Sequence, residues 1–173
     1  MKKIRMTLST SSIKDAIRQL EEHKRELSFK TMLFVQRLGE VGLRTVEAHK
    51  QSRGDSDFND LEAHVELERI SDMSVKAKLI LHGKDVAFIE FGAGVHYNGA
   101  GGSSPNPYGQ PLGMIIGSYG KGHGLEDSWV YYDEESGQFK TSYGTEAAMP
   151  MYYADREIIN SFVSIAQEVF GNG

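Results

Sequence analysis

The sequence predicts an α+β fold with a long N-terminal helix, a small antiparallel β-sheet carrying a long glycine-rich loop, and a C-terminal helix packed on the sheet. Three patterns lead to this prediction: helical spacing of apolar residues in the first third, alternation in the middle, and a broad helical stripe at the end. A length of 173 residues is typical of one domain with its own core. We therefore expect a single domain over residues 1–173.

The helical region is expected over residues 12–49, where apolar residues recur at spacings of three and four, close to a heptad. Two polar residues, Lys24 and Thr31, interrupt the row. Its apolar members are Ile17, Leu20, Leu27, Phe34, Leu38 and Val41. A helix of this length would span on the order of 50 Å, more than the diameter of a domain of this size.

Three arrangements reconcile that length with one domain. The helix bends near Gly39 and Gly42, or it divides into two helices with Ser28 as the second N-cap, or part of it packs on something outside its own domain. At the start of the helix, Ser12 and Asp15 resemble a capping box.

The antiparallel sheet is expected over residues 64–143. The segment HVELERI alternates as a strand, and SVKAKLILHGKDVAFIEF has the pattern of a hairpin that turns at Gly83 and Lys84. Its second arm, VAFIEF, is apolar on both faces, which is typical of a central strand. The segment SWVYYDEESGQFKTSYG predicts a second hairpin, with its turn at EESG.

Glycine, asparagine, serine and proline fill the segment after VAFIEF, and we expect a flexible loop over residues 93–125. The C-terminal helix is expected over residues 150–170. Pro150 suits its first position, and Gly171 suits its end. Its apolar stripe is broad enough to cover a sheet.

Composition excludes several classes of function. The formal net charge is −5, and basic residues are mixed with acids, so we expect no specific nucleic-acid ligand. No apolar run is long enough for a membrane span, and the N-terminus lacks the apolar core of a secretory signal. The chain has no cysteine, which excludes disulfides and thiolate chemistry and fits a protein made in a reducing cytoplasm.

Two glycine-rich stretches, GAGVHYNG and GSYGKGHG, invite comparison with phosphate-binding loops. A P-loop needs Ser or Thr after its lysine, but Lys121 precedes a glycine. The dinucleotide fingerprint needs a third glycine where Tyr97 stands, followed by a helix. Both contexts fail, so we expect no nucleotide cofactor, and no other cofactor is indicated.

Histidines at the two ends of the loop offer a second chemistry. His96 and His123 could meet in space and, with Glu90 or Asp127, form a metal site. No pair of histidines has helical ligand spacing, so residue type alone supports such a site. The alternative function is thus a small metal-dependent hydrolase with the glycine-rich loop as its lid.

Glu90 is the acid that most needs an explanation, because it stands between Ile89 and Phe91 on a segment placed inside the sheet. Either the strand ends there and Glu90 reaches solvent, or Glu90 pairs with a basic residue of a neighbouring subunit. The sequence leaves both alternatives open.

Two short motifs carry a resemblance to a known family: FIEFGAGV at residues 88–95 and GTEAAMPMYYA at residues 144–154. Together with the order of elements along most of the chain, they resemble the tail-component or tail-completion proteins of long-tailed bacteriophages, often called gene-product-ten-like. Glu90, Phe91 and Gly92 match the first motif. Pro150, with Met151 and Ala154, matches the second, although the family more often has Phe where Met151 stands.

The resemblance implies a structural virion protein without catalysis, assembled in the bacterial cytoplasm as a ring of identical subunits at the head–tail junction. Its implied partners are further copies of itself and the neck and tail-tube proteins of the phage. We expect the structural function to leave an exposed apolar patch on the first helix. A regulatory binding module of the antitoxin type is a third, weaker alternative. The expected interface with a subunit or partner comprises Glu90, Phe91, Gly92, His96, Tyr97, Pro150 and Met151.

Overall fold

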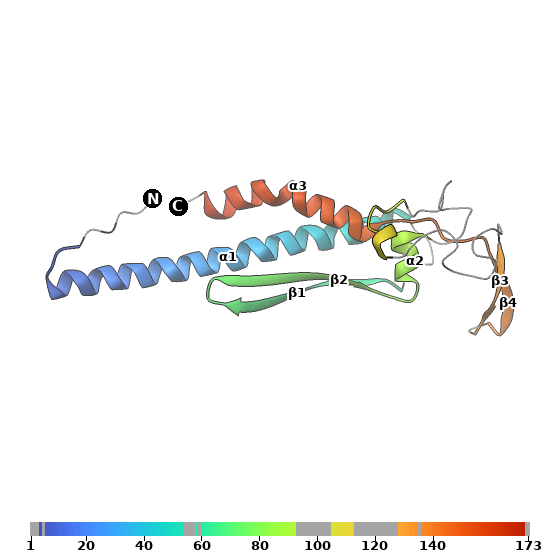
Figure 1. Ribbon diagram of the computed structural model, residues 1–173, viewed down its shortest axis with the longest axis horizontal. Helices are drawn as coiled ribbons and strands as arrows, with labels where there is room; N and C mark the ends of the chain where they lie inside the picture. The colour runs from blue at the N-terminus through green and yellow to red at the C-terminus, as the bar shows by residue number, and fades with distance from the viewer. Residues whose placement is uncertain are drawn as a thin grey trace. The chain divides into compact units, whose positions relative to one another are not determined.

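The computed structural model describes residues 4, 6–53, 58, 60–92, 105–112, 128–134 and 136–171. Their elements, in order, are α1 (Thr10–Arg53), β1 (Glu62–Ser71), β2 (Ser74–His82), α2 (Val86–Phe91), η2 (Gln110–Leu112), β3 (Trp129–Asp133), β4 (Gln138–Ser142) and α3 (Pro150–Phe170). The α+β prediction is confirmed: a long N-terminal helix, a small two-stranded antiparallel sheet and a C-terminal helix are present (Figure 1).

The chain forms two compact units. The first comprises Met1–Arg44, His64–Ile80 and Arg156–Gly173, and the second comprises Thr45–Ala63 and Leu81–Asp155. The long helix, the first hairpin and α3 each contribute residues to both units.

In the first unit, α1 lies between α3 and the β1–β2 hairpin (Figure 1). Phe34 of α1 packs edge-to-face on two rings of α3, with centroids 5.1 Å from Phe162 and 5.6 Å from Phe170. The Arg37 guanidinium lies 2.8 Å from the Glu168 carboxylate on the same side. Aromatic contacts of this kind give α1 and α3 a defined register.

The hairpin side of α1 is closely packed around a glycine. A Cβ atom on Gly42 would lie 2.7 Å from Ile158 Cδ1 of α3 and 2.9 Å from Leu79 Cδ2 of β2. A side chain at position 42 would therefore force the tips of Ile158 and Leu79 to shift, which favours glycine there although it lowers helix propensity. Packing against Ile158 and Leu79 therefore accounts for Gly42 without the bend in α1 that was one of the expected arrangements.

The start of α1 differs from the expected capping box. The helix begins at Thr10, and the backbone N–H of Ser12 donates to Ser9 Oγ at 3.3 Å, so Ser9 rather than Ser12 caps the first turn. The helix also continues without interruption through Ser28, whose hydroxyl accepts a hydrogen bond from Arg69 instead of capping a second helix. Continuous helical spacing on both sides of Ser28 explains why no break forms.

The second unit has its own core. Phe58, Leu61, Ile89 and Ala148 form a buried cluster, and Leu81 and Val86 pack against it. The Ala148 N–H donates to the Ile89 carbonyl at 2.7 Å, which fixes the chain entering α3 against α2.

The expected central strand at VAFIEF is wrong, because these residues form the short helix α2. The first sheet is the β1–β2 hairpin, which turns at Asp72 and Met73, so β2 already has an antiparallel partner. A short segment that is apolar on both faces is equally compatible with a buried helix, and burial of Ile89 and Glu90 decides between them.

The second expected hairpin is confirmed as β3–β4, with Tyr132 opposite Phe139 in an antiparallel register. Beside its turn, Asp133 accepts hydrogen bonds from Lys140 and from Ser136 Oγ. The Lys140 contact, followed by the Ser136 hydroxyl, lowers the pKa of Asp133 to about 2. Gly137 adopts φ +65°, as a tight turn requires.

Replacing Gly42 by valine is expected to lower the stability of the first unit. Valine has a higher helix propensity than glycine, so this substitution at an exposed helix position would raise stability. At position 42 the added atoms instead overpack against Ile158 and Leu79. We expect a loss of about 1–3 kcal/mol in the free energy of unfolding, measured by denaturant titration. Gln19→Val, on an exposed part of α1, is the matched control, and a Gly42 variant as stable as the native chain would contradict the close packing.

Candidate functional site

The buried Glu90 carboxylate of α2 lies at the N-terminus of α3, within the second unit. Its side chain is 7% exposed, and its oxygens accept hydrogen bonds from three donors. The Met151 N–H donates to Oε2 at 2.8 Å, the Tyr152 N–H donates to Oε1 at 2.9 Å, and Asn106 Nδ2 donates to Oε1 at 2.8 Å. The alternative in which Glu90 reaches solvent is thus wrong, because backbone and amide donors of its own chain hold the buried carboxylate. Pairing of Glu90 with a basic residue of a neighbouring subunit stays a prediction.

The start of α3 explains why it needs this carboxylate. The first turn of a helix leaves N–H groups without helical partners, and a Ser, Thr, Asp or Asn at the N-cap normally accepts one of them. Here Met149, with no oxygen in its side chain, precedes the helix at φ +57°, and Pro150 has no N–H. Glu90, distant in sequence, accepts the next two N–H groups, and its negative charge also suits the helix dipole.

Burial and hydrogen bonding act on Glu90 in opposite directions. Removal from water raises the pKa of the carboxyl group, while the Met151 and Tyr152 N–H groups, then Asn106 and the nearby His49, lower it. Burial is the larger effect, so the pKa is raised above 4.5. The donors nevertheless leave the carboxylate paired, which a buried charge requires.

Asn106 is the residue of this site that the sequence interpretation missed, because it lies inside the segment expected as a flexible loop. It is 1% exposed, its carbonyl oxygen accepts the Tyr108 N–H at 3.0 Å, and η2 follows directly. The part of the expected loop described by the structure, residues 105–112, is therefore anchored. An Asn–Pro pair that initiates an Asx turn was the available signal.

Aromatic residues line the same end of α3. Tyr108 contacts the Tyr152 ring edge-to-face at 6.0 Å, and its hydroxyl donates to Asp155 at 3.5 Å. His49 of α1 stacks on Tyr153 at 5.1 Å. These contacts tie the first turn of α3 to residues 105–112 and to α1.

The structure brings several of the predicted interface residues together. Glu90 contacts the Met151 backbone, Pro150 is fully buried, and Phe91 is half-buried. Gly92 ends α2 with φ +78°, a conformation that favours glycine, and its N–H donates to the Phe88 carbonyl. The described members are thus parts of a packed joint within one chain.

The remaining predicted residues, His96, Tyr97, His123 and Asp127, lie outside the described residues. Among those that are described, no group of three or more His, Cys, Asp or Glu side chains could hold a metal ion. Glu90 itself faces three hydrogen-bond donors, an environment that suits an anion and repels a cation. Its own surroundings therefore disfavour Glu90 as a metal ligand.

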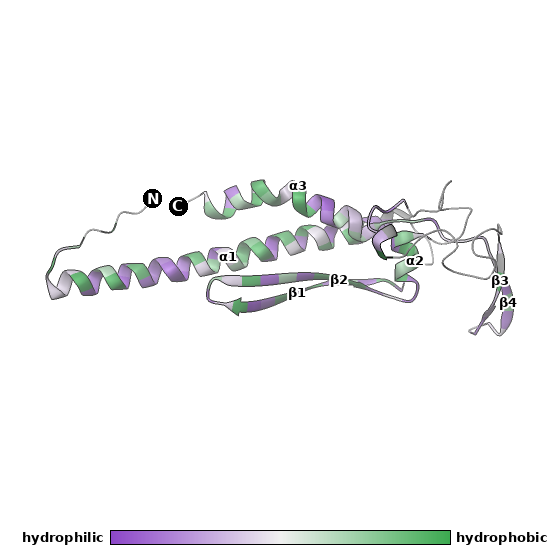
Figure 2. Ribbon diagram, viewed as in Figure 1, coloured by the Kyte–Doolittle hydropathy of each residue, from purple (hydrophilic) through white to green (hydrophobic). Residues whose placement is uncertain are grey.

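The first unit contains the second notable feature, an exposed apolar row on the N-terminal half of α1. Ile17 and Leu20 are 52% and 56% exposed, and the row also includes Ile13 and Leu27. We call these four residues the α1 row. Figure 2 shows hydrophobic residues alternating with hydrophilic ones along this part of the helix. The exposed apolar patch expected on the first helix is present.

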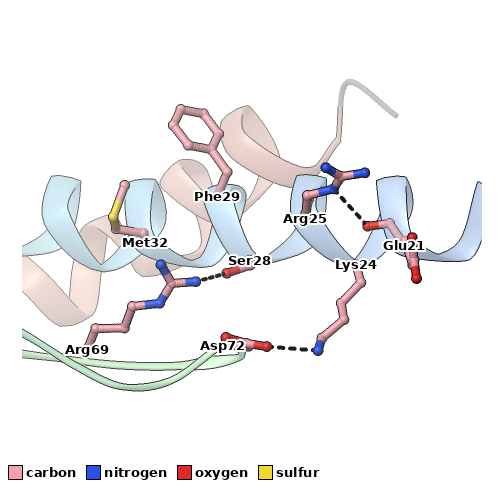
Figure 3. A pocket seen from close by; sticks show the side chains of 8 residues that line it. All are labelled: Glu21, Lys24, Arg25, Ser28, Phe29, Met32, Arg69 and Asp72. Atoms are coloured by element: carbon pink, nitrogen blue, oxygen red, sulfur yellow. Dashed lines mark hydrogen bonds and ion pairs between the residues drawn. The ribbon is translucent and has the colours of Figure 1, made fainter. Parts of the chain in front are cut away.

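Beside the row, α1 and the hairpin form an open groove of about 470 Å³. Lys24 reaches Asp72 at 2.8 Å and Arg69 reaches Ser28 at 2.8 Å, while Phe29 points away from the hairpin (Figure 3). The remaining lining residues are Glu21, Arg25 and Met32. Lys24 and Asp72 are thus an ion pair, whereas the Arg25 guanidinium donates to the backbone carbonyl of Glu21.

Comparisons with known family models, with curated proteins and with solved structures give no match. Within the part of the chain that the structure describes, none of the helices is both long and apolar enough to cross a membrane.

Asn106→Ala is expected to destabilise the second unit, because it removes one donor to the buried Glu90 and opens the Asx turn. A loss of about 1–3 kcal/mol in unfolding free energy is expected. Asn160→Ala, on an exposed position of α3, is the matched control. If residues 105–112 were independent of the core, both variants would unfold alike.

The raised pKa of Glu90 predicts a pH effect of definite sign. Between the ordinary value of 4.5 and the raised folded value, the folded chain binds more protons than the unfolded chain. Unfolding free energy should therefore decrease as pH rises through this interval. Glu90→Gln should remove that contribution to the slope, whereas exposed Glu22→Gln should keep it, as measured by denaturant titration at a series of pH values. Equal slopes in all three proteins would contradict a raised pKa at Glu90.

Proposed function

We propose that this protein is a structural component that assembles into a ring of identical subunits at the head–tail junction of a long-tailed bacteriophage. The exposed α1 row is the observation that supports self-assembly most directly. The phage assignment is supported by the resemblance of the Glu90–Phe91–Gly92 and Pro150–Met151 motifs. These motifs also meet in the fold, through the Glu90 to Met151 hydrogen bond.

The first unit leaves much of its apolar surface exposed. Among its described residues, the buried apolar side chains are Ala16, Ile165 and Val169. Large exposed apolar residues occur on α1, β1 and α3, including Leu20 of α1 and Ile70 of β1. Exposed apolar surface that gathers on one side of an element is typical of a protein–protein contact.

Apolar burial is the effect that would drive such assembly. Burying a large aliphatic side chain fully contributes about 1.5–3 kcal/mol, so half-exposed Ile17 and Leu20 would each add roughly 1 kcal/mol. Exposed ion pairs such as Arg18–Asp15 contribute about 0–1 kcal/mol and weaken in salt. The proposed oligomer should therefore persist at high ionic strength.

Light scattering over a concentration series tests the assembly. We expect a monomer that converts to one discrete oligomer, in low and high salt alike and without regard to added divalent metal. Leu20→Asp, which places a charge in the α1 row, should shift the transition to at least tenfold higher concentration. Gln19→Asp adds the same charge beside the row and should leave the transition in place.

Electron microscopy of the oligomer should show closed rings that bind one end of purified phage tail tubes. A chain that stays monomeric at every concentration, or that forms open filaments, would contradict the ring. Rings that ignore tail tubes would leave self-assembly standing and remove the head–tail assignment.

A further inference from the structure

The α1 row continues a contact that already exists inside the chain. Steps of seven residues lead from Phe34 back to Leu27, Leu20 and Ile13, which places all four on one side of the helix. Phe34 is covered by Phe162 and Phe170 of α3, and α3 ends at Phe170. The same side of α1 is thus packed on a helix at Phe34 and becomes exposed beyond the end of α3.

A second exposed row lies on α3 itself. Ile159 and Val163 are exposed, and Phe162 and Phe170 are also partly exposed although their rings contact Phe34. The buried side of the helix instead carries Ile165 and Val169. We call Ile159, Phe162, Val163 and Phe170 the α3 row.

The two rows match in spacing and length. Ile159, Val163 and Phe170 are separated by four and seven residues, and Ile13, Ile17 and Leu20 by four and three, so both follow the period of a coiled-coil seam. The α1 row extends over about 21 Å and the α3 row over about 17 Å, at 1.5 Å per residue. Each row could therefore cover most of the other.

From these observations we propose that the α1 row of one subunit binds the α3 row of a neighbouring copy. This inference rests on the proposed function and deepens it by naming the two surfaces. The neighbour's α3 would continue the line of the subunit's own α3 along α1, using apolar contacts of the same kind as Phe34 with Phe162. Because the two surfaces differ, the contact is head-to-tail, and repetition with closure produces a ring.

Pairing of two α1 rows with each other is the competing arrangement. It would bury the α1 row on both subunits, but it would leave the α3 row exposed and would stop at a dimer. A charge in the α3 row would abolish association only if α1 binds α3, whereas a charge in the α1 row would abolish it in both arrangements. A substitution in the α3 row therefore distinguishes the two.

The test uses two full-length variants, Leu20→Asp in the α1 row and Val163→Asp in the α3 row. Each retains one intact surface, so each alone should be monomeric by light scattering where the native chain is oligomeric. Mixed in equal amounts, they should form a one-to-one heterodimer that does not grow, because one intact pair of surfaces remains between them. Ile17→Asp, used instead of Leu20→Asp, should also be monomeric alone and should form the same heterodimer with Val163→Asp.

Gln19→Asp and Ser164→Asp are the matched controls, since both add a charge on exposed positions outside the rows. Circular dichroism and thermal unfolding should show that all variants keep the native helix content. Both controls should form the native oligomer.

Three outcomes would overturn the proposal in different ways. A Val163→Asp protein that dimerises by itself would show that α1 rows pair with each other. Native-size oligomers of both row variants would place the interface elsewhere and leave the proposed ring assembly intact. A native chain that is monomeric at all concentrations would remove the ring and this interface together.

Discussion

The start of α3 depends on the Glu90 carboxylate, because the local sequence offers no capping oxygen of its own. Met149 and Pro150 precede two N–H groups that would otherwise be buried without acceptors, and Glu90 accepts both. The same carboxylate holds Asn106, so one charged group joins α2, the 105–112 turns and α3. The pairing also explains how a carboxylate is tolerated at 7% exposure.

The two units satisfy their apolar residues in different ways. The second unit buries Phe58, Leu61 and Ile89 in a common cluster, and its polar groups at Glu90 are hydrogen-bonded internally. The first unit consists of a helix between a second helix and a hairpin, and much of its apolar surface remains exposed. The contacts around Glu90 thus hold the second unit together, and the exposed α1 and α3 rows of the first unit are the surfaces for which we propose association.

The α2 segment illustrates the limit of reading periodicity over a few residues. The apolar residues of VAFIEF would lie on both sides of either a strand or a helix, so their spacing does not distinguish the two. Two facts outside the segment decide for the helix: β2 is already paired with β1, and Glu90 must point at the first turn of α3. Gly92 then ends the helix with a positive φ. The glycine is visible in the sequence, but the sequence does not indicate whether it ends a strand or a helix.

The sequence by itself determined the fold class, the long first helix, the strands of β1 and β2, the second hairpin and the terminal helix. Each of these is long or regular enough for hydrophobic spacing to specify it. Tertiary structure alone decided the helical state of α2, the burial of Asn106 and the partner of Glu90. Those features join residues far apart in the chain, and local spacing contains no information about which distant donor a buried acceptor will meet.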